Sequence, residues 1–291
     1  MLLRLSLEIA DRVLTALPSP LAYGVADLAG DAWHRLAPAR RRLVAANLRR
    51  VCEATGRPAR GAPFAALVRA AFRNHARYYL ELLRAPRYPR DRIAEIVEVP
   101  DWEEYGAAMR SGPCVLVTAH LGNFEPFGTY LVARGVRALA PIEEIEPREL
   151  FDFLASRRGA GSVELVPRRK ARAALSRRLR EGGLVGIIGD RLLEGGGHPV
   201  RLFGHETEVP IGPATLAVMH RASVVVGRCL RVGPDRFLVD GEVLEVRETG
   251  DRRADITSLT ERIAARFERD IGAAPEQWWG AFQPFWPDLR A

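Results

Sequence analysis

The sequence predicts an α/β fold, in which a mixed, largely parallel sheet is flanked by helices and preceded by a helical N-terminal region. Two observations support this. From about residue 93 onward, short apolar runs alternate with segments of helical periodicity, which is typical of α/β proteins. Before residue 88 only helical periodicity is present. At 291 residues, the chain is long enough to bury a core without disulfides.

The N-terminal region is expected to be entirely helical. Apolar residues recur at helical spacing in four segments: 2–17, a segment beginning near Pro20, 38–51 and 64–83. The common interpretation of such stripes is a face of the protein core. The alternative is that the first helices lie in a membrane interface, because they are apolar on one side and flanked by arginines. We therefore predict residues 1–88 to be a helical, membrane-associating region, joined in one compact molecule to a core of residues 89–291.

Composition narrows the classes of partner. The chain carries 43 Lys and Arg against 36 Asp and Glu, a net charge of +7, and Lys170 is its only lysine. A GC-rich genome produces such an arginine bias without any function. A positive surplus otherwise favours an anionic partner: a membrane surface, a nucleotide-bearing cofactor or nucleic acid. The three cysteines are far apart and form no CxxC pair, so neither a disulfide framework nor a zinc site is expected.

No segment is predicted to be a signal peptide or a membrane span. Charged residues interrupt the apolar start of the chain, and the longest uncharged run there covers only residues 13–26. A spanning helix needs about 20 apolar residues.

The second region supplies the expected sheet. Strands are predicted at 115–118, 138–142, 163–166, 184–188, 200–203 and 224–230. Helices are predicted at 124–133, 148–157, 171–181 and 213–220. Ligands of open α/β sheets bind at the carboxyl ends of the strands, so the residues that follow each strand are the candidates for function.

The end of the first of these strands carries the clearest chemical pattern. His120 follows the apolar run, Gly122 makes a turn, and Glu125 lies in the first turn of the next helix. A histidine there can accept a proton from a hydroxyl, and the carboxylate is predicted to hold one ring nitrogen. The backbone amides of residues 122–124 are predicted to face a developing oxyanion. The spacing alone is weak support, although His120 is the only one of six histidines with an acid five positions later.

The segment Thr118-Ala-His-Leu-Gly-Asn-Phe-Glu125 resembles the His-x4-Asp/Glu signature of the lipid A and phosphatidylinositol mannoside acyltransferases. The resemblance extends over roughly residues 5–290 and is stronger to the mannoside branch. Further similar motifs are Asn47-Leu-Arg, Tyr78-Tyr-Leu-Glu, Glu143-Glu-Ile-Glu-Pro, Gly189-Asp-Arg, Leu202-Phe-Gly, Gly212-Pro-Ala-Thr-Leu-Ala, Glu276-Gln-Trp and Phe282-Gln-Pro-Phe-Trp-Pro. The chain departs from the mannoside branch at Glu125, where that branch has Asp.

The resemblance implies a glycerolipid acyltransferase-like fold and a peripheral enzyme on the cytoplasmic face of the inner membrane. It implies acyl-CoA or acyl carrier protein as donor, no cofactor and no metal, an anionic membrane surface as partner and no nucleic acid. The acceptor would be a membrane glycolipid: a phosphatidylinositol mannoside, or a lipid A precursor in a lauroyl or myristoyl transferase. His120 would be the general base and Glu125 its partner. The implied substrate-binding residues are Gly122, Asn123, Glu143, Arg158, Asp190, Arg191, Glu194, Phe203 and Gly204.

Several features allow a structural and a functional interpretation. Asp190 is either a substrate ligand, a helix cap or half of an ion pair. The basic run 168–170 is either a solvated face or a contact for the phosphates of coenzyme A. The glycines at 195–197 predict a flexible turn that gates the pocket, and the aromatic C-terminus is either core or a membrane-interface anchor.

Two other functional classes stay open from the residues alone. A thioesterase or lipase-like hydrolase would need a nucleophile elbow, and no GxSxG is present. A basic membrane- or nucleic-acid-binding protein accounts for the arginines, yet it leaves His120 at the strand end without a role.

Overall fold

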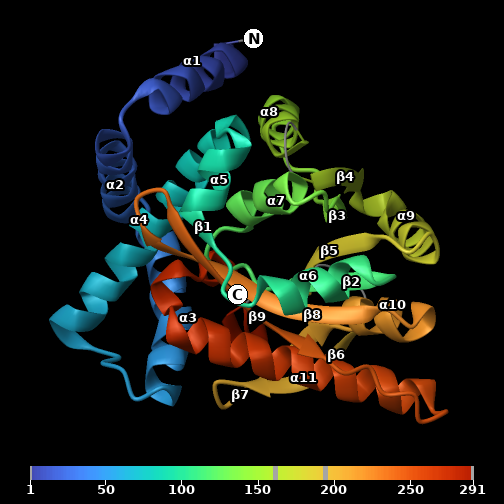
Figure 1. Ribbon diagram of the computed structural model, residues 1–291. Coiled ribbons are helices and arrows are strands. Elements are labelled where there is room, and N and C mark those ends of the chain that lie inside the picture. Colours follow the sequence, from blue (N-terminus) through green and yellow to red (C-terminus); the bar gives the residue numbers. More distant parts are fainter. Residues whose placement is uncertain (1, 160–162, 193–195, 290–291) are drawn as a thin grey trace.

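The computed structural model describes residues 2–159, 163–192 and 196–289 (Figure 1). Its N-terminal region is helical, as predicted, with α1 (Leu2–Ala16), α2 (Ser19–Leu36), α3 (Pro38–Ala54) and α4 (Gly61–Arg84). Gly30 lets α2 lie directly on α4, because a Cβ at this position would approach the Cα of Arg73 to 2.6 Å. A short turn, η1 (Ala85–Arg87), and α5 (Arg90–Ile96) lead to the sheet.

The main sheet is mixed and largely parallel, which confirms the predicted fold class. Its strands are β1 (Val97–Glu98), β2 (Cys114–Thr118), β3 (Ala138–Ile142), β4 (Val163–Pro167), β5 (Leu184–Ile188), β8 (Ser223–Gly233) and β9 (Arg236–Leu244). They follow the order β1-β9-β8-β2-β5-β3-β4. The β8–β9 pair is antiparallel and every other pair is parallel.

The predicted strand at 200–203 belongs to a separate hairpin rather than to the main sheet. There β6 (Gly197–Leu202) pairs with β7 (His205–Pro210) in antiparallel register. Phe203 and Gly204 form the two-residue turn with φ angles of 52° and 77°. Positive φ at both positions matches the right-handed twist of the paired strands, which explains the tight connection.

Helices cover both faces of the sheet. The remaining ones are α6 (Trp102–Arg110), α7 (Phe124–Ala133), α8 (Arg148–Gly159), α9 (Arg168–Arg180), α10 (Gly212–His220) and α11 (Arg252–Ala273), followed by η2 (Pro275–Gln277), η3 (Trp279–Phe282) and η4 (Pro287–Leu289). Successive strand residues point to opposite faces. Val115 and Val117 accordingly belong to the core cluster that contains α9, α10 and α11, whereas Cys114 belongs to the cluster that contains α5, α6 and α7.

The aromatic C-terminal segment is part of the core. Trp278 and Trp286 are fully buried, and Phe285 packs against both. The same core cluster includes Val44 and Leu48 of α3 and Phe72 of α4, so the N-terminal helices share the hydrophobic interior of the sheet. The interpretation of this aromatic segment as part of the core is therefore confirmed for these residues.

The structure of the described residues bears on two predictions made from the sequence, those on disulfides and on membrane spans. The cysteines Cys52, Cys114 and Cys229 are buried free thiols. Within residues 2–159, 163–192 and 196–289, none of the helices combines the length and apolar character required to cross a bilayer.

Candidate active site

His120 and Asp190 meet at the carboxyl edge of the sheet. Each lies two residues beyond its strand, His120 after β2 and Asp190 after β5. These strands are parallel neighbours with Thr118 opposite Ile188, so the residues that follow them also lie side by side. The Nδ1 of His120 is 2.5 Å from Oδ1 of Asp190.

The surroundings of Asp190 keep its carboxylate charged. The residue is 1% exposed, and burial alone would raise its pKa; the charge of His120 and hydrogen bonds from His120 and Trp278 outweigh this, so the pKa is lowered. The indole Nε1 of Trp278 donates to Oδ2 at 3.2 Å. Because a carboxylate only accepts hydrogen bonds, Nδ1 of His120 is the donor to Asp190, and in the neutral ring this leaves the lone pair on Nε2.

The turn after His120 is fixed by its backbone. Gly122 has a φ of +64°, and a Cβ there would lie 2.0 Å from the carbonyl oxygen of Cys229, so only glycine fits. The amide of Gly122 donates to the carbonyl of Gln277 at 3.0 Å, and that of Asn123 donates to the carbonyl of Cys229 at 2.8 Å. The prediction that these two amides face an oxyanion is therefore wrong.

Asn123 is a structural part of the same turn. Its Oδ1 accepts a hydrogen bond from the amide of Glu125 at 3.0 Å and so caps α7. Its Nδ2 donates to Oε2 of Glu81 at 2.8 Å, and the side chain is fully buried. Gly122 and Asn123 were predicted to bind substrate, but the structure places them behind the site rather than among the residues that line the cavity described below.

Glu125 does not contact the ring of His120. Its Oε1 accepts hydrogen bonds from Nε of Arg158 at 2.8 Å and from the hydroxyl of Tyr78 at 3.4 Å. Arg158 also donates to the Tyr78 hydroxyl at 2.5 Å. Burial raises the pKa of Tyr78 above its usual value despite the nearby guanidinium, so the phenol stays protonated. The prediction that Glu125 holds a ring nitrogen is corrected: Asp190 occupies that position.

A largely apolar channel of about 520 Å³ opens beside His120. It lies between the sheet and helices α7 and α8, which are found beside β3 and β4 in Figure 1. Lining positions run along β3 from its first residue, Ala138, to its last, Ile142. At about 3.3 Å per residue this is a depth of roughly 13 Å. Other apolar lining residues are Leu116, Phe124, Phe127, Leu131, Phe151, Leu154, Val163, Leu165, Ala171, Gly186, Ile187, Ile188 and Leu192.

Polar residues gather at the His120 end of the channel. Glu143 and Arg191, both predicted site residues, line it and form an ion pair of 2.7 Å. Arg158 and Arg168 line it too. Arg169 does not, and its Nε lies 3.8 Å from a carboxylate oxygen of Glu144.

Two further predicted residues, Phe203 and Gly204, are not brought to the channel. Phe203 and Gly204 lie in the β6–β7 turn, where Phe203 packs near Trp286 and neither residue lines the cavity. Glu194 and Gly195 lie outside the residues that the structure describes, so the role of Glu194 in substrate binding stays a prediction. Of the predicted flexible turn at 195–197, only residues 196 and 197 are described.

Aromatic side chains distant in sequence complete the site. The ring of Trp279 stands perpendicular to that of His120 with centroids 4.4 Å apart. Tyr78, Tyr79 and Trp279 all line the channel. The sequence predicted a helical stripe for Tyr78 and Tyr79 and either a core or a membrane-interface role for the segment that contains Trp279, because nothing in the local pattern links these residues to His120.

Comparison with known proteins agrees with the family resemblance seen in the sequence. A family model described as bacterial lipid A biosynthesis acyltransferase matches residues 7–286. A phosphatidylinositol mannoside acyltransferase of Mycolicibacterium smegmatis is 28% identical over 281 residues, which cover 94% of this chain and 88% of that protein. A phosphatidylinositol mannoside acyltransferase of Mycobacterium tuberculosis H37Rv is 29% identical over 228 residues, covering 76% and 70% respectively.

Proposed function

Because the chain belongs to the bacterial lipid A biosynthesis acyltransferase family, we propose that it moves a long-chain fatty acyl group from a thioester donor, acyl-CoA or acyl carrier protein, to a hydroxyl of a membrane glycolipid. Family membership makes the protein an acyltransferase. The names of the two mycobacterial relatives support a phosphatidylinositol mannoside as acceptor. The observation that carries the proposal is His120, held by the buried Asp190 at the mouth of an apolar channel.

In the proposed reaction His120 is the general base. Its Nε2 takes the proton of the acceptor hydroxyl while the hydroxyl oxygen forms a bond to the thioester carbonyl carbon. Asp190 stabilises the imidazolium that results, because its charge lies against Nδ1. When the tetrahedral intermediate collapses, the C–S bond breaks and the imidazolium returns the proton to the departing thiolate. The products are an ester and a free thiol.

Glu125 is assigned a different role, that of positioning Arg158. The carboxylate and the Tyr78 hydroxyl hold the guanidinium at the polar end of the channel. A guanidinium held by two partners is oriented before substrate arrives and binds phosphate or a developing oxyanion well. Arg168 and the Glu143–Arg191 pair lie at the same end and are proposed to meet the donor phosphates or acceptor sugar hydroxyls.

The channel is proposed to hold the acyl chain. Its apolar lining and its depth along β3 suit an extended hydrocarbon, whose transfer from water is favourable by about 0.8 kcal/mol for each buried CH₂. The carbonyl carbon would then lie at the open end beside His120, where the acceptor hydroxyl arrives.

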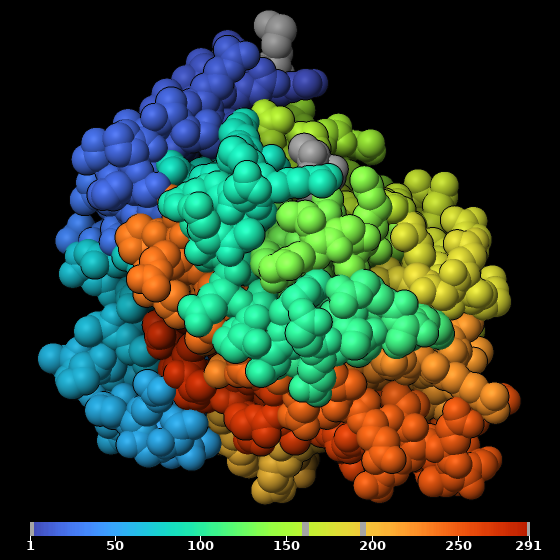
Figure 2. Space-filling view, viewed as in Figure 1, coloured from blue at the N-terminus to red at the C-terminus, as the bar shows by residue number. Residues whose placement is uncertain are grey.

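Helices α1 and α2 are proposed to dock the protein on the membrane. Their exposed apolar side chains lie at helical spacing: Leu5, Ile9 and Val13 on α1, and Leu21, Val25 and Leu28 on α2. The charged Asp11 of α1 is instead turned inward, 1% exposed and paired with Arg87 and Arg157. A helix that exposes its apolar residues to solvent and buries its carboxylate is suited to binding a lipid surface. These helices form the upper left flank in Figures 1 and 2.

An acceptor panel tests the proposal. Thiol release from palmitoyl-CoA and from palmitoyl carrier protein is measured with phosphatidylinositol mannosides, with a lipid A precursor and without acceptor. We expect release only with a mannoside acceptor, and incorporation of labelled palmitate into that lipid. Release without acceptor would indicate a thioesterase, and transfer to the lipid A precursor alone would overturn the acceptor assignment.

A further inference from the structure

A second cavity, of about 780 Å³, lies at the opposite edge of the sheet from His120. Pro113, Gly182 and Arg221, which precede β2, β5 and β8, form one side of it. The ends of α9 and α10 and the start of α11 form the others. It shares none of its lining residues with the acyl channel.

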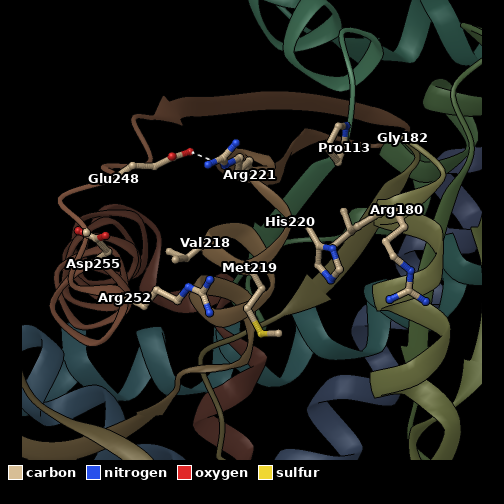
Figure 3. A pocket seen from close by; sticks show the side chains of 12 residues that line it. Pro113, Arg180, Gly182, Val218, Met219, His220, Arg221, Glu248, Arg252 and Asp255 are labelled. Atoms are coloured by element: carbon tan, nitrogen blue, oxygen red, sulfur yellow. Dashed lines mark ion pairs between the residues drawn. The ribbon is translucent and has the colours of Figure 1, made fainter.

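This cavity, called here the amino-edge cavity, is lined by several basic residues. Its basic lining residues are Arg180, His220, Arg221 and Arg252. In the view of Figure 3, Arg221 faces Glu248, and His220 lies between Met219 and Arg180. Pro113, Leu179, Val218 and Met219 contribute apolar surface.

The two acids of the cavity are already engaged. Glu248 lies 3.3 Å from Nε of Arg221. Asp255 is buried and accepts hydrogen bonds from the amide of Thr249 at 3.1 Å and from its hydroxyl at 2.8 Å. Within the described residues, Arg180 and Arg252 have no carboxylate at ion-pair distance, so the cavity keeps a surplus of positive charge.

Helix electrostatics account for part of this set but not for Arg252. Cations are favoured at helix C-termini, where Arg180 ends α9 and His220 ends α10. Arg252 is the first residue of α11, at the end where the helix dipole is unfavourable for a cation. The capping Asp251 and the first-turn Asp255 offset that field, and the exposed Arg252 lines the cavity.

One side of the cavity is also held in place by hydrogen bonds. Ser176 Oγ accepts from Nη1 of Arg180 at 3.0 Å and lies 2.8 Å from Nε2 of His220. The guanidinium and the imidazole are thus linked across α9 and α10. The contact with Ser176 uses only Nη1 of Arg180, and arginine binds the oxygens of a phosphate well.

We propose that the amino-edge cavity binds the phosphate group of a phosphate monoester, with Arg180 and Arg252 as its principal ligands and the apolar wall against the organic part. The volume lies within the range of small-molecule sites. The site is separate from the acyl channel, and the inference does not depend on the identity of the acceptor lipid.

Calorimetric titration tests this on the full chain with AMP and glycerol 3-phosphate as probes and adenosine and glycerol as neutral controls. We expect both phosphate esters to bind and neither neutral compound to do so. Arg180→Gln and Arg252→Gln should each weaken binding about ten- to a hundredfold. Arg253→Gln is the matched control, because this neighbouring arginine does not line the cavity and its loss should leave affinity unchanged.

Three results would overturn the proposal: no binding of either ester to the wild type, equal weakening by Arg253→Gln, or equal affinity for sulfate, which would indicate a nonselective basic surface. Vesicles with and without phosphatidic acid distinguish the source of the phosphate. Wild-type protein that binds the soluble esters but not the phosphatidic acid vesicles indicates a free metabolite as the ligand. Binding of both, weakened by Arg252→Gln, indicates that a lipid headgroup also enters the cavity. Basal acyl transfer should be unchanged in Arg252→Gln.

Discussion

The charge on Asp190 is the residue-level feature on which the proposed reaction depends. A carboxylate with 1% of its surface exposed is costly to bury without partners, and His120 and Trp278 supply them on its two oxygens. Glu125, with a similarly buried carboxylate, is matched by Arg158 instead. The two acids are thus held by different partners, and only Asp190 contacts the histidine.

His75 is a second buried titratable residue, next to the site rather than in it. It stacks on Tyr79 and packs against Phe282, and its Nδ1 has no hydrogen-bond partner among the described residues. Burial, together with the positive charges of His120 and Arg40, lowers its pKa to about 3. The ring therefore stays neutral in the folded protein at any pH at which the enzyme is expected to work.

This burial predicts a pH dependence of stability. An unfolded histidine titrates near pH 6.5. Between about pH 6.5 and pH 3 the unfolded chain therefore binds a proton that folded His75 does not, and the free energy of unfolding falls as the pH falls. The loss is about 1.4 kcal/mol per pH unit for one such group. His75→Phe should reduce this slope in urea unfolding between pH 6.5 and 4, whereas His198→Gln, which removes a histidine paired with the exposed Glu261, should change it little. Equal slopes for His75→Phe and the wild type would contradict the assignment.

At the scale of elements, the strands were largely predictable and their partners were not. β2, β3 and β5 are interior strands of the sheet and read as apolar runs, so composition alone located them. β4 is an edge strand, and it was located because three of its residues around the exposed Glu164 are apolar. The neighbour of β2, and therefore the residue beside His120, depends on the register between β2 and β5. That register is set by packing across the whole sheet, which is why Glu125 seemed the nearer candidate from sequence.

Two elements that were not predicted from the sequence are β9 and α11. β9 carries Asp240 and Glu242 among its apolar residues, so it lacks a clean strand pattern. α11 has a low overall hydrophobicity, although Leu259, Ile263, Phe267 and Ile271 repeat every fourth residue and are all buried. That spacing is typical of an amphipathic helix and could have predicted α11. Nothing local indicated that Tyr78 of α4 and Trp279 of η3 approach the catalytic turn.

The channel element gives a prediction about acyl-chain length. Gly186 of β5 lies opposite Leu116 of β2, partway down the channel, and a Cβ there would meet only Ala140 at 3.9 Å. Gly186→Val should fold normally but fill the channel below His120. We expect the preference for palmitoyl- over decanoyl-CoA to fall about tenfold or more, since valine displaces the outer methylenes.

The comparison is made over acyl-CoAs from octanoyl to stearoyl, with circular dichroism as the test of folding. Gly186→Ala is the matched control and should shift the profile only slightly. An unchanged chain-length profile in Gly186→Val would show that the acyl chain lies elsewhere.

In the whole molecule, helix α1 lies close to the channel. α1 is bound through Asp11 to Arg157 of α8, and Arg158, the next residue of that helix, lines the channel. The apolar faces of α1 and α2 would therefore bring the channel mouth near the lipid surface from which the acceptor comes. The amino-edge cavity lies at the other end of the strands.

This arrangement predicts where lipid binding resides. The double substitution Ile9→Gln and Leu28→Gln removes two exposed apolar side chains from α1 and α2, which are 53% and 71% exposed. Co-sedimentation with anionic vesicles should weaken about tenfold or more, because each side chain contributes roughly 1.5–3 kcal/mol when buried. Ile211→Gln is the control, since Ile211 is 40% exposed, lines neither cavity and lies at the start of α10, a helix away from α1 and α2 in Figure 1. Equal weakening by Ile211→Gln would contradict a localised docking face.

In the proposed reaction His120 acts as the base, and Asp190, rather than Glu125, supports it. The most direct test is kcat for acceptor-dependent thiol release in three variants: His120→Ala, Asp190→Asn and Glu125→Gln. We predict that the first two lower kcat by about 10²–10⁴ with retained folding, as loss of a general base or its orienting charge does. Glu125→Gln, which leaves His120 and Asp190 in contact, should mainly raise KM. A loss of kcat in Glu125→Gln as large as in His120→Ala, with Asp190→Asn near wild type, would contradict the assignment.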